Sequence, residues 1–255
     1  MQINTDGLVI MEKSVGENDR LITVLTREEG VLRAFARQAK LLNSRRHAAT
    51  QLLSYSQFQI YKGKDKYIIN DAQPEHVFFG LRSDIERLSL AQYFCELACR
   101  LAPEGMPAGD FLRLVLNGLH FLEKGSRSPF LVKAAVEMRM LSFAGYMPDL
   151  IGCSKCGCYE SKVLYFLPKR GMITCENCYH ETGEVAIPLQ SGVMTALRHT
   201  IYADFEKLFS FQLPEEGLRR LAEAAESYVG AVLECRLATL DFYHSLIPAQ
   251  QVVPK

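Results

Sequence analysis

The sequence predicts an α+β protein in which a small N-terminal β-barrel is followed by an all-helical domain with a cysteine-rich insert. Apolar residues recur with a period near two in the first eighty residues and with a period near 3.6 from Leu81 onward. The chain has 255 residues, 48% of them hydrophobic, which is enough to bury the cores of two small domains. We expect a barrel domain at residues 1–80 and a helical domain at residues 81–255, with the insert at residues 150–188.

Five short strands are expected in the barrel domain. Runs of apolar and β-branched residues occur at residues 8–12, 21–26, 31–37, 58–61 and 67–69. Turn-forming residues separate these runs, and a Gly63-Lys64-Asp65 turn joins the last two as a hairpin. Five strands in about seventy residues fit an OB-fold or an SH3-like barrel, and we take the OB-fold as the prediction.

Helices are expected at residues 81–101, 111–123, 129–145, 191–202 and 214–246. The segment APEGMPAGD breaks the pattern between the first two. Pro129 begins the third helix, because proline is tolerated in a first helical turn. The last helix is expected to be long and unbroken.

The insert has the cysteine spacing of a zinc ribbon. Its four candidate ligands form two C-x2-C pairs separated by eighteen residues: Cys153, Cys156, Cys175 and Cys178. Segments 163–167 and 171–174 are the expected arms of the hairpin between the pairs. Four thiolates leave no open position for a substrate, so we predict one structural Zn²⁺. Cys158 is a nearby thiol that can replace one ligand, and three further cysteines are interpreted as core thiols: Cys95, Cys99 and Cys235.

Positive charge gathers in one early stretch, although the formal net charge of the chain is zero. Between residues 33 and 66, eight Lys or Arg accompany a single acid, so this stretch carries +7 and the rest of the chain −7. If residues 31–37 form a strand, Arg33, Phe35 and Arg37 share one face. Cations around an aromatic ring are typical of surfaces that bind single-stranded nucleic acid. The candidate DNA-binding residues are Arg33, Phe35, Arg37, Lys40, Arg45, Arg46, Lys62, Lys64 and Lys66.

A solvated basic face with Phe35 in the core is the alternative interpretation of this stretch. No helix is basic along one face, so a transcription factor that reads the major groove is not favoured. The barrel that carries the charge favours nucleic-acid binding over the alternative.

Nothing in the sequence indicates an enzyme. Six histidines are scattered, and the sequence contains no HExxH, GxGxxG, GxxxxGK[ST] or GxSxG motif. The N-terminus lacks the basic and apolar regions of a signal peptide, and no apolar run reaches the roughly 20 residues needed to cross a bilayer. We therefore expect a non-enzymatic protein of the reducing cytoplasm with no membrane partner.

Two segments are distinctive: GLVIMEKSVGENDRLITVLTREEGVL at residues 7–32 and GYMPDLIGCSKCG at residues 145–157. Both resemble the corresponding segments of the RecO family of bacterial recombination mediators. The resemblance extends over essentially the full length. It implies an N-terminal OB-fold that binds single- and double-stranded DNA, annealing of complementary strands, and a four-cysteine zinc site.

The resemblance also implies partners and a location. RecO proteins act with RecR to load RecA onto DNA coated by single-stranded-DNA-binding protein (SSB), so RecA is an indirect partner. Some members contact the C-terminal tail of SSB, and the family implies a bacterial, nucleoid-associated location. One departure concerns the loop after the third strand, where the family often has a glycine and this sequence has Gln38 between Arg37 and Lys40.

The hypothesis is a mediator whose barrel binds phosphates while aromatic rings stack on bases. Phe35 is the first candidate ring, with Tyr55 and Tyr61 as further candidates. The helical domain would hold the SSB tail in an apolar groove with a basic rim, for which the candidates are Arg113, Lys133 and Arg139. Two rivals stay open: an adaptor whose basic stretch docks an acidic protein without DNA binding, and a zinc-containing enzyme of nucleic-acid processing.

Overall fold

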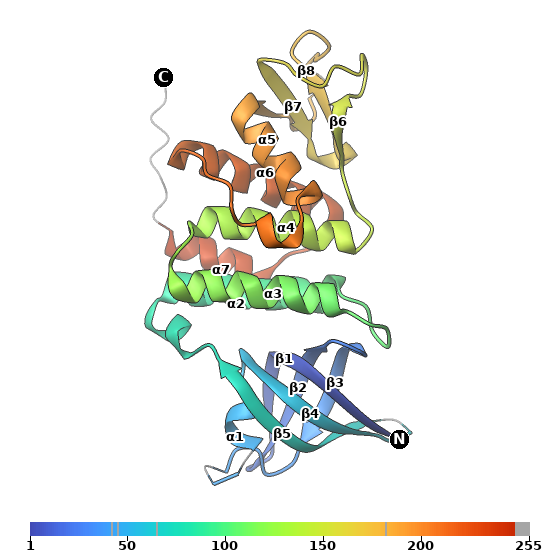
Figure 1. Cartoon of the computed structure of the whole chain (residues 1–255), viewed down its shortest axis with the longest axis vertical. Coiled ribbons are helices and arrows are strands. Elements are labelled where there is room, and N and C mark those ends of the chain that lie inside the picture. The colour runs from blue at the N-terminus through green and yellow to red at the C-terminus, as the bar shows by residue number, and fades with distance from the viewer. Residues whose placement is uncertain (42, 45, 65, 182, 248–255) are drawn as a thin grey trace. The chain divides into compact units, whose positions relative to one another are not determined.

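The computed structural model describes residues 1–41, 43–44, 46–64, 66–181 and 183–247 (Figure 1). The chain forms two compact units. Among the described residues, the first comprises Met1–Lys124 together with residues 237–247, and the second comprises Gly125–Arg236. The domain boundary predicted at residue 80 lies inside the first unit, and the predicted insert lies inside the second.

Five strands of the first unit close into a barrel in the order β1-β2-β3-β5-β4. The strands are β1 (Gln2–Val15), β2 (Asp19–Thr26), β3 (Gly30–Ala36), β4 (Ser54–Lys62) and β5 (Tyr67–Val77). The strands pair antiparallel except for β3 and β5, which pair parallel and close the barrel. A short helix, α1 (Arg46–Ala49), lies in the connection between β3 and β4.

β1 is longer than the sequence pattern predicts because it belongs to both halves of the barrel. Its residues from Gln2 to Leu8 pair with β4, and those from Gly7 to Val15 pair with β2. The register shifts between Val9 and Met11. A bulge of this kind bends a strand, which lets one strand turn the corner between two sheet halves.

The barrel core follows the period of two that the strands require. In β4 buried and more exposed residues alternate, and the inward side chains include Phe58 and Ile60. Ile22 and Val24 from β2 and Ile69 from β5 fill the same interior. The apolar runs found in the sequence therefore form the inside of the barrel.

Three α-helices complete the first unit: α2 (Ile85–Leu101), α3 (Gly109–Lys124) and α7 (Ala238–Leu246). The Asp84 side chain accepts a hydrogen bond from the Arg87 N–H and caps α2 after the 3₁₀ turn η1 (Phe79–Ser83). α2 packs against α3, α7 and β1. Figure 1 shows α2 and α3 running side by side, which their packing requires.

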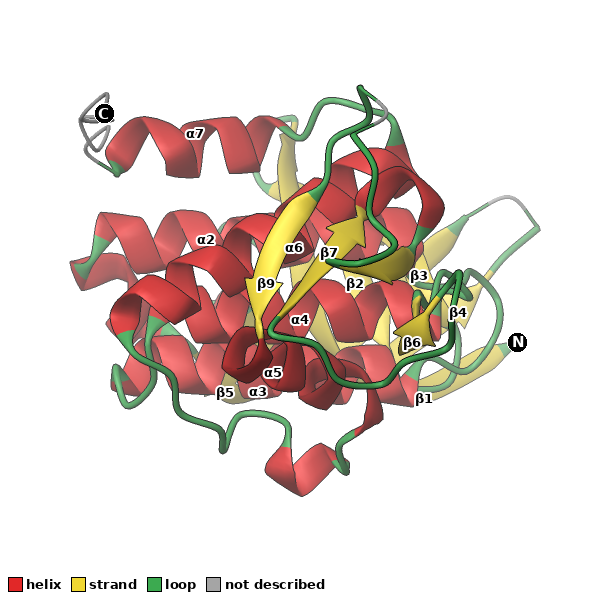
Figure 2. Ribbon diagram, turned by 90° about the horizontal axis from the view of Figure 1, so that it is seen from above, coloured by secondary structure: helices red, strands yellow, loops and turns green. Residues whose placement is uncertain are grey.

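The second unit combines helices with a small sheet. Its helices are α4 (Pro129–Phe143), α5 (Ser191–Tyr202) and α6 (Glu215–Leu233), with the 3₁₀ turns η2 (Pro168–Arg170) and η3 (Phe205–Lys207). Its strands are β6 (Asp149–Cys153), β7 (Val163–Leu167), β8 (Met172–Cys175) and β9 (Ile187–Gln190), in the order β6-β8-β7-β9. Figure 2 shows β7 and β9 side by side. β7 and β8 form the predicted antiparallel hairpin.

The prediction of one unbroken helix at residues 214–246 is wrong. α6 ends at Leu233, and α7 begins at Ala238. Glu234 takes a left-handed conformation with φ of 47° and ends α6, and its N–H still bonds the Gly230 carbonyl. The two helices belong to different compact units. Among the described residues, no helix has the length and apolar character needed to cross a membrane.

A candidate nucleic-acid interface and a cysteine cluster

The outer face of β3 carries the predicted cation and aromatic ring. Arg33 and Phe35 point outward, while Ala34 and its neighbours on the other face are buried. Phe35 is 36% exposed. The alternative that places Phe35 in the core is therefore wrong, because the strand alternation directs this ring to solvent.

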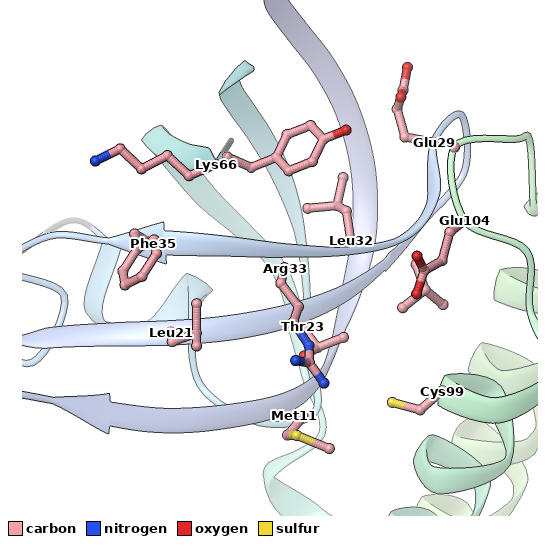
Figure 3. Close-up of a pocket in the computed structure, with 13 residues that line it drawn as sticks. Met11, Leu21, Thr23, Glu29, Leu32, Arg33, Phe35, Lys66, Cys99 and Glu104 are labelled. Carbon is pink, nitrogen blue, oxygen red and sulfur yellow. The ribbon is translucent and has the colours of Figure 1, made fainter. Parts of the chain in front are cut away.

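Phe35 and Arg33 line a groove of about 860 Å³ (Figure 3), which we call the barrel groove. Its barrel side is formed by β1, β2 and β3, with Lys66 and Tyr67 at the start of β5. Its other side is formed by Cys99 of α2 and by Glu104 in the loop after α2. All of these elements belong to the first unit. Sequence reasoning missed the α2 side, because no local pattern places residue 99 beside residue 33.

The loop after β3 is held by hydrogen bonds that its backbone N–H groups donate. Gln38 has φ of 53°, in the left-handed region that favours glycine. Its N–H donates to the Asp19 carboxylate at 2.8 Å, and the Lys40 N–H donates to the Asn18 carbonyl at 3.0 Å. Arg37 is exposed and Lys40 is half-buried. The chain therefore has Gln38 in place of the family's glycine at a position whose backbone conformation favours glycine.

Of the predicted arginine pair Arg45 and Arg46, the structure describes only Arg46. Arg45 lies outside the described residues. Arg46 is half-buried, and its guanidinium donates to the Ile69 carbonyl at 3.2 Å. Arg20 fixes the same helix by donating to the His47 carbonyl at 2.7 Å. Arg46 therefore has a structural contact in addition to its predicted role.

The three predicted lysines of the β4–β5 hairpin are exposed, but their surroundings differ. Lys62 Nζ lies 3.8 Å from a Glu29 carboxylate oxygen and 5.5 Å from the centre of the Tyr67 ring. The hydrogen bond with the Tyr67 side chain is the main cause that raises the pKa of Lys62, and the charges of Tyr67 and Glu29 add to it. Lys66 lines the barrel groove, and Lys64 is exposed beside it in the hairpin.

The two further candidate rings, Tyr55 and Tyr61, differ in their hydrogen bonding and exposure. The Tyr55 hydroxyl donates to the Asp6 carboxylate at 2.6 Å, and the Arg27 guanidinium binds the same carboxylate at 2.7 Å. Burial raises the pKa of Tyr55 to about 12, with a further contribution from Asp6. Tyr55 is therefore part of a structural network, whereas Tyr61 is 47% exposed on β4.

The four predicted zinc ligands come together in the second unit. Cys153 ends β6, Cys175 ends β8, and the other member of each pair lies in the turn that follows. Their four sulfur atoms all lie within 4.8 Å of one another, and the Cys156 and Cys175 sulfurs are 3.7 Å apart. Tetrahedral coordination with metal–sulfur bonds of about 2.3 Å needs sulfur atoms about 3.8 Å apart. The donor set and its geometry are compatible with a metal site.

The members of this cluster differ in how readily they ionise: hydrogen bonds with Cys156 and Cys175 raise the pKa of Cys178 to about 12, whereas backbone groups favour the thiolate of Cys153. Burial opposes ionisation of Cys153, but hydrogen bonds from the backbone of Cys175, Cys156 and Lys155 lower its pKa to about 6. Cys158 lies outside the group of four. Hydrogen bonding to the Cys156 thiol is the main cause that raises the pKa of Cys158 to about 12. Cys158 is thus close to the cluster without being one of its four members.

The three predicted rim residues do not form one basic rim. Arg113 is exposed on α3 of the first unit. Lys133 is only 2% exposed, and its Nζ lies 2.7 Å from Glu137 and 2.8 Å from Glu226. Arg139 is also buried and donates to the backbone carbonyls of α5 and the residue after it. We correct the prediction for Lys133 and Arg139, because internal contacts and not solvent surround their charges.

Comparison with known proteins covers almost the whole chain. A model described as "Recombination protein O N terminal" matches residues 1–78, and one described as "Recombination protein O C terminal" matches residues 82–241. A protein of Acetivibrio thermocellus named DNA repair protein RecO is 34% identical over 244 residues, which cover 96% of this chain and 97% of the relative. Its namesake in Symbiobacterium thermophilum is 31% identical over 250 residues, covering 97% and 98%.

Proposed function

This chain belongs to the RecO family of DNA repair and recombination proteins, and we propose that it binds single- and double-stranded DNA and anneals complementary strands without enzymatic chemistry. The observation that carries the proposal is the barrel groove. A partly exposed ring, Phe35, lines this groove together with the cations Arg33 and Lys66. Cations that bind phosphates and a ring that stacks on bases are what a single-strand site requires.

The strand order supports an OB-fold as the barrel type. OB-folds are five-stranded barrels that bind oligonucleotides on the face of strands 2 and 3 and on the loops after strands 1 and 4. Here β2 and β3 line the groove, and Lys64 and Lys66 lie in the connection after β4. The location of the proposed site therefore agrees with the proposed fold.

Annealing follows from charge neutralisation. Binding of phosphates by Lys and Arg releases condensed counterions and does not depend on base sequence. Two strands that are both neutralised by one protein surface repel each other less, so they pair without energy from ATP. The double-stranded product keeps its phosphates available to the same cations.

We propose one structural Zn²⁺ in the second unit. Cys153, Cys156, Cys175 and Cys178 would hold the ion, and the 3.7 Å distance between two of their sulfurs supports the assignment. The ion would supply four metal–sulfur bonds and no open coordination position. These cysteines would then join the end of β6 to the end of β8, which stabilises the small sheet.

RecR, the SSB tail and, indirectly, RecA are the proposed partners, on the basis of family membership. A groove of about 580 Å³ in the second unit is a better candidate for an apolar peptide than the corrected rim residues. Its lining includes Ile151, Tyr159 and Tyr202, which are 68%, 56% and 49% exposed. The Arg198 guanidinium lies 3.9 Å from the centre of the Tyr159 ring. We propose this groove as the SSB-tail site, tested by loss of tail binding in Ile151→Ser.

The salt dependence of binding to a labelled single strand tests the central proposal. The slope of log affinity against log salt is about −0.7 per phosphate neutralised on a single strand. We expect Lys66→Ala to make the slope shallower by about 0.7, while Lys124→Ala leaves it unchanged. Lys124 is the matched control because it is an exposed lysine of the same unit that does not line the groove.

Two results would contradict the proposal. If the wild type fails to bind at low salt, the basic surface faces a protein, as the adaptor hypothesis predicts. If Lys66→Ala and Lys124→Ala behave alike, the strand does not lie in the barrel groove.

A further inference from the structure

The two ends of the barrel groove carry opposite charge. Figure 3 shows Phe35 and Lys66 toward one end and the carboxylates of Glu29 and Glu104 toward the other. Arg33 lies between these ends. A phosphate backbone that follows the groove from Lys66 therefore meets negative charge before it reaches the far end.

The acidic end is held in place by backbone contacts. Gly30 and Glu104 form a β-bridge between the start of β3 and the loop after α2. The Val31 N–H donates to the Pro103 carbonyl at 2.8 Å, and the Gly105 N–H donates to the Glu29 carbonyl at 2.9 Å. A Cβ atom on Gly30 would lie 2.0 Å from the Pro103 oxygen, so only glycine allows this approach. The two carboxylates thus project from backbone that is fixed across the groove.

Glu29 also pairs with Lys62, one of the cations predicted to bind phosphate. Its carboxylate lies 3.8 Å from Lys62 Nζ, and its side chain is 23% exposed whereas that of Lys62 is 44% exposed. A phosphate that used Lys62 would have to displace Glu29 or share the charge with it. Lys62 is therefore less available to DNA than Lys64 and Lys66 in the same hairpin.

We propose that the carboxylates of Glu29 and Glu104 mark the end of the surface along which the barrel groove binds a nucleic-acid backbone. Glu29 also pairs with Lys62 and so makes this cation less available to phosphate. This inference rests on the proposed function, since it concerns the same groove. It makes the two acids specificity-determining residues that limit the length of strand that one barrel engages. Because they repel the backbone and do not touch bases, the limit applies to any sequence.

The experiment measures binding of oligothymidylates of increasing length across a salt series. Glu29→Gln and Glu104→Gln remove each charge with little change of shape, and Glu28→Gln is the control. Glu28 is exposed, adjacent in sequence and not part of the groove lining, so it reports the general effect of removing one negative charge. Thermal unfolding of each variant verifies that the fold is retained.

We expect Glu29→Gln to bind more tightly and with a slope steeper by about 0.7 than Glu28→Gln, as for one added phosphate contact. One such contact makes affinity fall roughly two- to threefold further over a fourfold rise in salt. Glu104→Gln should increase the oligonucleotide length at which affinity stops rising. In a Lys62→Ala background, Glu29→Gln should lose its excess over Glu28→Gln, because the cation that it releases is absent.

Different results would contradict the proposed DNA binding and the proposed role of the two acids. A wild type that fails to bind at low salt would overturn the proposed function and this inference with it. A wild type that binds, with Glu29→Gln and Glu104→Gln both equal to Glu28→Gln, would overturn this inference alone. Persistence of the Glu29→Gln effect in the Lys62→Ala background would overturn the role assigned to Lys62.

Discussion

The two compact units use charged side chains in opposite ways. On the barrel, the cations of β3 and the β4–β5 hairpin lie outside a core formed by apolar side chains and a closed hydrogen-bonded sheet. In the second unit, Lys133 and Glu137 lie inside, and four cysteines gather at one end of a small sheet. These exposed cations of β3 and the hairpin can therefore be lost with little loss of stability, whereas the second unit depends on its buried polar groups.

Removal of the cysteine cluster should have the largest effect. Cys175→Ser is expected to abolish stoichiometric Zn²⁺ binding and to unfold the small sheet, since zinc contributes on the order of 10 kcal/mol to the folding of comparable modules. Hydrogen exchange should increase in β6–β8 and stay low in the barrel strands. Cys158→Ser is the control and should retain one Zn²⁺ per chain. Equal metal content and equal protection in both variants would contradict the proposed ligand set.

Loss of the buried ion pairs of Lys133 should have the second largest effect. Lys133→Met leaves Glu137 and Glu226 without their cation, so we expect a loss of about 3–5 kcal/mol in the free energy of unfolding. Lys162→Met, at an exposed position of the same unit, should change it by less than about 0.5 kcal/mol. Chemical denaturation at neutral pH measures both. Similar values for the two variants would show that buried and exposed lysines contribute equally.

The same ion pair predicts a dependence on alkaline pH. Burial alone lowers the pKa of Lys133, but the charges of Glu137 and Glu226 outweigh it and raise the pKa. A pKa raised in the folded state gives stability that is complete below the value of the unfolded chain and is lost as pH rises through the folded value. The difference between wild type and Lys133→Met should therefore shrink at strongly alkaline pH.

On the barrel, the network of Asp6, Arg27 and Tyr55 should contribute less. Asp6→Asn is expected to cost about 1 kcal/mol, because Arg27 is partly exposed and solvent screens the pair. Burial opposes ionisation of Asp6, but hydrogen bonds from Arg27 and Tyr55 lower its pKa below the usual value. This stability is present above the pKa of the unfolded chain and is lost as pH falls through the folded pKa.

Urea unfolding at neutral and acidic pH tests the Asp6 prediction, with Asp71→Asn on β5 as the control. The destabilisation caused by Asp6→Asn should diminish as pH falls below the ordinary aspartate range. A constant difference at all pH values would mean that charge is not the source of the effect.

The smallest effect concerns Gln38. Gln38→Gly should stabilise the barrel by up to about 1 kcal/mol, because glycine adopts the observed φ of 53° without a steric cost. Gln38→Ala is the control, since it removes the side chain and keeps the unfavourable φ. Thermal unfolding should rank Gln38→Gly above both Gln38→Ala and wild type. If Gly and Ala are equal, the backbone at residue 38 is not strained.

Local sequence patterns predicted most of the elements, the cysteine cluster and the barrel side of the groove, but not its α2 side. The alternation in β3 correctly directed Arg33 and Phe35 outward, and two C-x2-C pairs correctly predicted that four distant cysteines meet. In both cases the information is local: a strand period of two, or a turn that directs two thiols at one point. The roles assigned to these residues stay predictions until the measurements above are made.

Tertiary packing decided what local patterns leave open. The sequence marks Lys133 as a cation, but only the position of Glu226 on another helix determines that this cation is buried. It marks residues 214–246 as helical, but the turn at Glu234 separates α7, which packs on α2 in the first unit. Likewise, Glu104 lines the barrel groove together with Arg33 because a β-bridge joins Gly30 to Glu104, 74 residues later in the chain. Periodicity reports which side of an element is apolar, whereas the partner of that side depends on contacts between residues distant in the chain.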